Sequence, residues 1–198
     1  MVFEALFGII LLDEKGVIFM SVTLKENQIA FAKIRETAII PSKKPEDAGY
    51  DMYANLEEDY LVIEPGKTKA IPTGIATAFP SKYYIQIEER SSMAKIGVKK
   101  SGGVFDSGYR GEYFIMTYNT NDKPFVISKI PAEEMPETFE VDGKTYKTAD
   151  VMLYPYTKAV CQAVLQEIPV LEEIELSYDE LCEIKSERGK GGFGSSGK

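Results

Sequence analysis

Histidine is absent from the 198 residues of this chain. Its absence excludes Ser-His-Asp triads, Cys-His dyads, HExxH zinc sites and the His-x-Glu signature of zinc deaminases. Any acid–base chemistry therefore has to come from a carboxylate, a lysine or a tyrosine.

Cysteine and long apolar runs are also scarce. Cys161 and Cys182 are too few for a disulfide framework and lack the spacing of metal ligands, which favours a reducing cytoplasm. No apolar run has the length needed to span a membrane, so no membrane partner is expected. The apolar stretch 3–12 contains a glutamate and is followed by two acidic residues instead of a cleavage site, so secretion is not expected.

Positive charge is in deficit, with 23 Lys and Arg residues against 31 Asp and Glu residues and a formal net charge of −8. Binding to nucleic acid relies on a broad basic surface that releases counterions, so a nucleic-acid partner is not expected. A small anion remains compatible with this balance, provided that local positive charge, a metal ion or both are present.

Short β-type runs separated by Pro, Gly, Asn and Asp dominate the chain. They lie at 29–34, 60–63, 68–71, 74–79, 83–87, 112–119, 125–130 and 159–165. Many short strands with frequent turns predict an all-β sandwich or barrel of mainly antiparallel strands. One short helix is predicted at 91–95, with its serines suited to the N-cap.

The chain is predicted to form one β domain over residues 20–186. Because Met20 begins the first plausible strand, residues 1–19 are expected to be an N-terminal extension, upstream of an alternative start. The segment 120–157 carries four prolines and an acidic cluster, and predicts an inserted arm with a hairpin turn at Asp142 and Gly143.

The final residues, 187–198, combine Arg188 and Phe193 with five glycines and two serines. A guanidinium and hydroxyls suit phosphate oxygens, glycine amides can form an anion-binding nest, and a phenyl ring offers a flat surface for a base. This segment is expected to be a lid that becomes ordered on a ligand. The alternative is a flexible Gly/Ser tail.

Two further segments carry candidate chemistry. Residues 102–112 form a strand, a tight turn and a strand, with Asp106 at the bend, where its carboxylate can orient a water molecule. The alternative is a hairpin in which Asp106 only caps its own turn. Upstream, Arg90, Ser91 and Ser92 place a guanidinium beside two hydroxyls, a combination that suits phosphate.

Five segments occur together in a specific order: 47–54, 90–94, 103–111, Gln162 and 187–197. In order and approximate spacing they resemble the five motifs of the trimeric dUTP diphosphatases, the dUTPases. The resemblance implies a jelly-roll-like β fold, assembled as a homotrimer in which subunits share active sites. It implies hydrolysis of dUTP to dUMP and diphosphate, which keeps uracil out of DNA and supplies dUMP for thymidylate synthesis.

The resemblance also implies the roles of particular residues. Asp106 would deprotonate the attacking water, Tyr109 would pack under the deoxyribose, and Phe193 would stack on uracil. Asp51 would support the site near Mg²⁺, which would be held mainly by triphosphate and water, with no direct protein ligand. The implied substrate-binding residues are Arg90, Ser91, Ser92, Gly103, Val104, Phe105, Tyr109, Gln162, Arg188, Phe193, Gly194, Ser195 and Ser196.

The sequence departs from the family pattern in places. The glycine turn that normally precedes Gln162 is missing, which weakens that residue's assignment. The arm resembles the insertion of some phage enzymes, so the cytoplasm of a bacterium or of a phage-infected host is expected.

Two rival functions stay open. One is a dCTP deaminase, or a bifunctional deaminase and dUTPase, although Met116 stands where such chemistry needs a glutamate. The other is a regulatory dUTPase-like module whose arm contacts a protein partner.

Overall fold

The computed structural model describes residues 9–12 and 18–191. They belong to two compact units, a body spanning residues 1–168 and a C-terminal segment spanning residues 169–198. No helix in the described part of the chain is long and apolar enough to cross a membrane.

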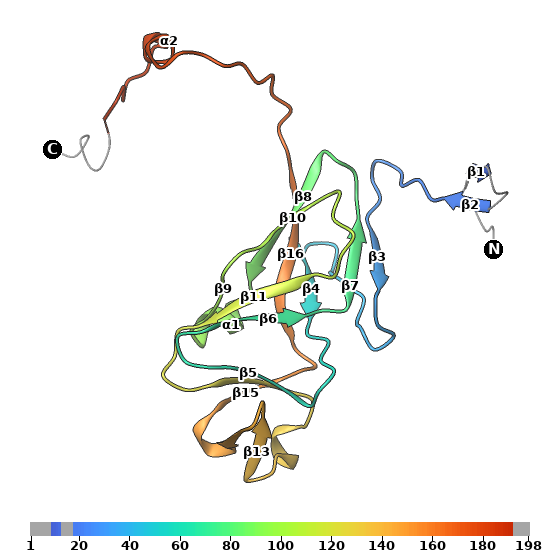
Figure 1. Cartoon of the computed structure of the whole chain (residues 1–198), viewed down its shortest axis with the longest axis vertical. Coiled ribbons are helices and arrows are strands. Elements are labelled where there is room, and N and C mark those ends of the chain that lie inside the picture. The colour runs from blue at the N-terminus through green and yellow to red at the C-terminus, as the bar shows by residue number, and fades with distance from the viewer. Residues whose placement is uncertain (1–8, 13–17, 192–198) are drawn as a thin grey trace. The chain divides into compact units, whose positions relative to one another are not determined.

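The body is built almost entirely of strands, which confirms the all-β prediction (Figure 1). Its strands are β1 (Ile9–Leu12), β2 (Ile18–Ser21), β3 (Ala30–Lys33), β4 (Gly49–Tyr53), β5 (Tyr60–Ile63), β6 (Thr68–Pro72), β7 (Ile75–Ala78), β8 (Tyr83–Glu89), β9 (Val98–Lys100), β10 (Val104–Asp106), β11 (Phe114–Asn119), β12 (Phe125–Ser128), β13 (Thr138–Val141), β14 (Lys144–Lys147), β15 (Met152–Pro155) and β16 (Ala159–Glu167).

The helices are short. Helix α1 (Ser91–Lys95) has the predicted bounds, and the 3₁₀ turns η1 (Ala132–Glu134) and η2 (Thr148–Asp150) flank the β13–β14 hairpin. A second α-helix, α2 (Tyr178–Glu183), lies in the C-terminal segment, so the expectation of a single helix was wrong. Its N-terminus is fixed by a capping box between Ser177 and Glu180.

The strands pair into small, mainly antiparallel sheets, of which the sheet ordered β10-β8-β16-β4 is central to the site. The other orders are β6-β11-β9, β15-β12-β5, β3-β7, β13-β14 and β1-β2. Apolar side chains alternate inward: Ile85 and Ile87 on β8 and Ile115 on β11 are buried in one core. This alternation fixes the register, because a slip of one residue would move those side chains to the surface.

The segment 120–157 contributes both to the body and to a separate hairpin. Strands β12 and β15 pair with each other in the body, whereas β13 and β14 form the predicted hairpin, with positive φ at Asp142 and Gly143. Figure 1 shows this hairpin next to β5 and β15. A second hydrophobic cluster joins it to the body through Phe139 and Tyr146 on the hairpin, which pack with Val62 and Val126.

A polar anchor accompanies this packing. Glu64, which follows β5, is bonded to the ammonium of Lys144 and accepts a hydrogen bond from the Tyr146 hydroxyl at 2.7 Å. These two donors, with Lys144 the stronger cause, lower the pKa of Glu64 below its ordinary value of 4.5. Burial and then Glu64 raise the pKa of Tyr146 to about 12, so Tyr146 remains a donor at neutral pH.

The anchor predicts a pH-dependent stability. Because the pKa of Glu64 is lowered by folding, its stabilisation is complete above pH 4.5 and is lost as the pH falls through the folded-state value. We expect Glu64→Gln to lower the free energy of unfolding by about 1 kcal/mol or less at pH 7, the range of partly exposed ion pairs. Urea unfolding at pH 7 and pH 3 should show this difference shrinking at the lower pH; an equal difference at both would contradict the prediction.

Candidate active site

Asp106 ends the edge strand β10, where Val104, Phe105 and Asp106 pair with β8. Its side chain is exposed and makes no hydrogen bond within the described part of the chain. The turn that follows is closed by the backbone, since the Tyr109 N–H donates to the Asp106 carbonyl at 3.1 Å. The carboxylate is therefore not used to cap its own turn, and is available to a ligand or a water molecule.

Three aromatic rings support the loop that carries Asp106. Phe105 stacks on the buried Tyr113, with centroids 3.8 Å apart and ring planes 7° apart. The ring of Tyr109 lies 6.1 Å from Phe105 and 6.0 Å from Tyr113, and it is 42% exposed. The Tyr109 hydroxyl donates to the Glu112 carbonyl at 3.0 Å, which fixes the ring in a partly exposed position three residues after Asp106.

Backbone groups are available beside this loop. In the described sheet, β10 has a strand partner on one side only, so its other edge can hydrogen-bond to a ligand. Gly103, at φ 153°, has its carbonyl bonded to the Ile87 N–H at 2.7 Å, and a Cβ there would lie 2.9 Å from the Ile87 Cβ. Only glycine fits this close approach of β10 to β8. Val104 is 62% exposed.

Three polar residues, Asp51, Gln162 and Arg90, lie close together on or next to neighbouring strands of this sheet. Asp51 on β4 faces Gln162 on β16 in the strand register, and the Gln162 amide donates to the Asp51 carboxylate at 3.3 Å. The Arg90 guanidinium lies 3.5 Å from the same carboxylate. Asp51 thus orients both Arg90 and Gln162, even though the glycine turn expected before Gln162 is missing.

Arg90 is also the N-cap of α1, and Ser91 and Ser92 are the first two helical residues. The prediction of a serine N-cap was wrong: the cap makes no side-chain hydrogen bond, and the serine side chains are exposed. Neither hydroxyl caps the helix, and both serines are exposed next to Arg90, with the Ser92 side chain within hydrogen-bonding reach of the Tyr154 phenol.

Two residues that the sequence did not assign to the site, Tyr154 and Cys161, lie near Arg90 and Asp51. Burial raises the pKa of the Tyr154 phenol, whose hydroxyl donates to the Ala159 carbonyl at 2.7 Å. Burial likewise raises the pKa of the Cys161 thiol, which keeps it protonated and inert. Neither had a signal in the sequence, because both lie in runs that have the pattern of ordinary strands.

Of the site residues predicted in the C-terminal segment, Arg188 lies within the described residues. The Arg188 side chain is exposed, and its Nε donates to the Gly191 carbonyl at 2.8 Å within its own unit. Phe193, Gly194, Ser195 and Ser196 lie outside the described residues.

One carboxylate of the described residues, that of Asp51, lies beside the Arg90 guanidinium and could contribute to a metal site. Within residues 9–12 and 18–191, no group of three or more His, Cys, Asp or Glu side chains is arranged to hold a metal. Asp51 is the carboxylate paired with the Arg90 guanidinium, and a single carboxylate does not hold Mg²⁺ without further oxygen ligands. Phosphate oxygens and water would have to supply most of its coordination.

Comparison with known proteins gives a consistent result. The family model described as dUTPase matches residues 35–130. A deoxyuridine 5'-triphosphate nucleotidohydrolase of Clostridioides difficile is 34% identical over 169 residues, covering 83% of this chain and 94% of that protein.

Among solved structures, the fold is similar to the dUTPase of Staphylococcus bacteriophage 80alpha with dUPNHPP. Its TM-score is 0.64 at 24% identity, covering 87% of this chain and 99% of that one. A mutant dUTPase of phage phi11 of S. aureus, in which a structural Mg(II) ion is coordinated, has a TM-score of 0.56 at 21% identity, covering 76% and 97%.

Proposed function

The chain belongs to the dUTPase family and hydrolyses dUTP, and we propose that Asp106 is the general base of this reaction. The observation that carries the proposal is a free carboxylate at the end of an edge strand, in a chain that has no histidine. Asp106 accepts a proton from water as the water oxygen bonds to the α-phosphorus. The bond from that phosphorus to the bridging oxygen breaks, releasing diphosphate and leaving dUMP.

The phosphates are the part of the substrate that needs positive charge. Arg90, with Ser91 and Ser92, binds them. The Asp51 carboxylate holds the Arg90 guanidinium in place and is itself held by a hydrogen bond from Gln162. The family uses Mg²⁺, which when bound neutralises charge on the triphosphate. Phosphate oxygens and water would supply most of its ligands, and the Asp51 carboxylate would hold one of those water molecules.

Base and sugar are recognised by the β10 loop. The open backbone edge at Gly103 and Val104 is suited to read the pairing edge of uracil, with Phe105 supporting it from below. The exposed ring of Tyr109 packs under the deoxyribose, where a 2′-hydroxyl would collide with it. Discrimination against ribose therefore depends on where the Tyr109 ring is held.

The experiment that tests this function measures diphosphate and ammonia release from each deoxynucleoside triphosphate, with Mg²⁺ and after its removal by a chelator. Diphosphate is expected from dUTP alone and mainly with Mg²⁺ present. Ammonia released from dCTP would overturn the assignment in favour of a deaminase. Met116 argues against that outcome, because a thioether cannot relay protons.

A homotrimer with shared sites is part of the proposal. Alternate side chains of β11 leave Phe114, Met116 and Tyr118 exposed on one face of the sheet, 36–45% each. In the C-terminal segment Val170 and Leu171 are 93% and 80% exposed. Apolar surface of this kind is typical of an interface between subunits. Light scattering should give a trimer mass, and a monomer would contradict it.

The C-terminal residues belong to the same proposal. Arg188, Ser195 and Ser196 clamp the γ end of the triphosphate, and Phe193 and Gly194 cover uracil. The segment that carries them comes from one subunit and closes over a site of another.

The β13–β14 hairpin is proposed to dock a protein partner and to be dispensable for turnover, because it lies outside all five motifs. Its flank exposes Glu133, Glu134 and Glu137. Deleting residues 133–148 is expected to leave kcat within about threefold of wild type. It should lower Tm by several degrees, since the deletion uncovers Val62 and Val126. Loss of kcat in a protein that is still trimeric would contradict this prediction.

A further inference from the structure

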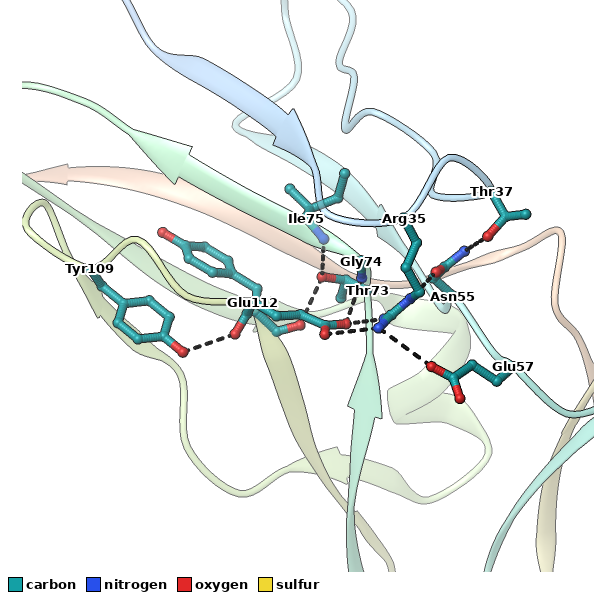
Figure 2. Close-up of polar contacts among 10 residues, drawn as sticks. Arg35, Thr37, Asn55, Glu57, Thr73, Gly74, Ile75, Tyr109 and Glu112 are labelled. Atoms are coloured by element: carbon teal, nitrogen blue, oxygen red, sulfur yellow. Dashed lines mark hydrogen bonds and ion pairs between the residues drawn. The ribbon is translucent and has the colours of Figure 1, made fainter. Parts of the chain in front are cut away.

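A largely buried ion pair lies behind the Asp106 loop, between residues far apart in the sequence. Figure 2 shows the Arg35 guanidinium meeting the Glu112 carboxylate side on, in a two-pronged contact. The Glu112 side chain is 11% exposed and that of Arg35 is 27% exposed. A bidentate pair of this kind fixes both distance and orientation, which a single lysine contact does not.

Each partner has further bonds that hold it in place. Glu112 also accepts the Gly74 N–H at 2.7 Å, while the Arg35 Nε donates to the Asn55 side-chain carbonyl at 2.6 Å. The Asn55 amide in turn donates to the Thr37 hydroxyl at 3.0 Å. Gly74 has φ 65°, and a Cβ there would meet the Asn55 side chain at 2.7 Å. The turn at Gly74 therefore admits only glycine, and the Glu112 carboxylate is bonded to the backbone of this constrained turn.

The support continues into the loop that carries Asp106. The Glu112 carbonyl accepts the Tyr109 hydroxyl at 3.0 Å, and the next residue, Tyr113, stacks on Phe105. Tyr113 is itself held by Thr73, whose hydroxyl donates to the Tyr113 carbonyl at 2.7 Å. The side chain and backbone of Glu112 thus join Arg35 to Tyr109, and its neighbour Tyr113 joins the same region to Phe105.

We propose that the Arg35–Glu112 pair is a positioning device that fixes the Asp106–Tyr109 loop, and that it thereby sets both the turnover of dUTP and the discrimination against UTP. The inference rests on the proposed roles of Asp106 and Tyr109. Neither Arg35 nor Glu112 touches the substrate in this proposal. Glu112 acts through Tyr109 and the backbone, and Arg35 acts through Glu112. A displacement of about 1 Å at a reacting group can lower a rate by about a hundredfold.

The test compares Glu112→Gln, Arg35→Met and the double variant. Each single variant is expected to lower kcat for dUTP about tenfold or more, and to lower the ratio of kcat/KM for dUTP over UTP by a similar factor. The double variant should recover part of both losses, because no buried charge is then left without its partner. Arg35→Lys, which keeps the charge without the fork, should fall between wild type and Arg35→Met.

A matched control is the exposed pair Lys69–Asp142, whose charged atoms lie 3.5 Å apart. Lys69→Met and Asp142→Asn should leave kcat and the sugar ratio unchanged. The decisive assays are run at a temperature well below Tm. If Glu112→Gln and Arg35→Lys lower Tm but leave kcat for dUTP and the dUTP/UTP ratio of kcat/KM at wild-type values, the pair is merely structural and the proposal is wrong. If Glu112→Gln does not fold, Arg35→Lys decides by the same criterion.

Failure of the positioning role and failure of the proposed role of Asp106 give different results in these variants. Full turnover in Asp106→Asn would remove Asp106 from its proposed role, and the sugar ratio in the Glu112 and Arg35 variants would still report on Tyr109. Loss of turnover in Asp106→Asn together with wild-type behaviour of the Arg35 and Glu112 variants would overturn only the positioning role.

Discussion

Asp106→Asn is expected to lower kcat for dUTP by about 10²–10⁴-fold, the contribution of a general base. Asparagine keeps the size of the side chain but cannot accept the proton of the attacking water. Because the Asp106 carboxylate makes no hydrogen bond within the described residues, the substitution removes no structural contact there. Tm should remain close to that of wild type, and steady-state diphosphate release gives kcat.

A measurement of substrate-analogue affinity distinguishes loss of the general base from a general disruption of the active site. Asp106→Asn should bind a non-hydrolysable dUTP analogue within about threefold of wild type, measured by calorimetry. Asp122→Asn, at another exposed aspartate, serves as the matched control and should be fully active. Unchanged turnover in Asp106→Asn would mean that another group is the base.

Truncation after Glu187 is expected to give a folded trimer with at most about one hundredth of the wild-type kcat/KM. The shortened chain keeps the entire body and α2 but loses Arg188, Phe193 and the two serines that are proposed to clamp the γ end. A charge-assisted contact to phosphate is worth more than a neutral one, and closing a site over its substrate excludes water. Light scattering tests the assembly, and diphosphate release tests the activity.

Two point variants sharpen the interpretation of the truncation. Arg188→Ala should reproduce most of the loss, and Phe193→Ala should raise KM for dUTP. Lys185→Ala, three residues upstream of Arg188 in the same segment, should leave both parameters unchanged. A fully active truncated trimer would show that the glycine-rich residues are a passive tail.

Local pattern predicted several strands, because β-type residues and the turn residues that bound them are features of neighbouring positions in the sequence. The run at Tyr60–Ile63, which is bounded by Pro65 and Gly66, and the hairpin turn at Asp142 and Gly143 were predicted correctly from β-type residues and turn residues. The cap of α1 was predicted wrongly, because local sequence does not decide whether the helix begins at Arg90 or at a serine. Helix α2 was not predicted, and its N-terminus is fixed by the capping box between Ser177 and Glu180.

The sequence by itself determined which chemical groups are present: no histidine, an aspartate in a glycine-rich turn, and an arginine beside two serines, in an order that resembles the family's motifs. Whether that aspartate caps its own turn was left open by the sequence. Only the tertiary structure decided which of these groups meet. Asp51 and Gln162 are 111 residues apart and Arg35 and Glu112 are 77 apart, so strand pairing and packing across the sheets bring them into contact. The physical reason is that a side chain's partners follow from the register of buried strands, and that register is set by the whole core rather than by neighbouring residues.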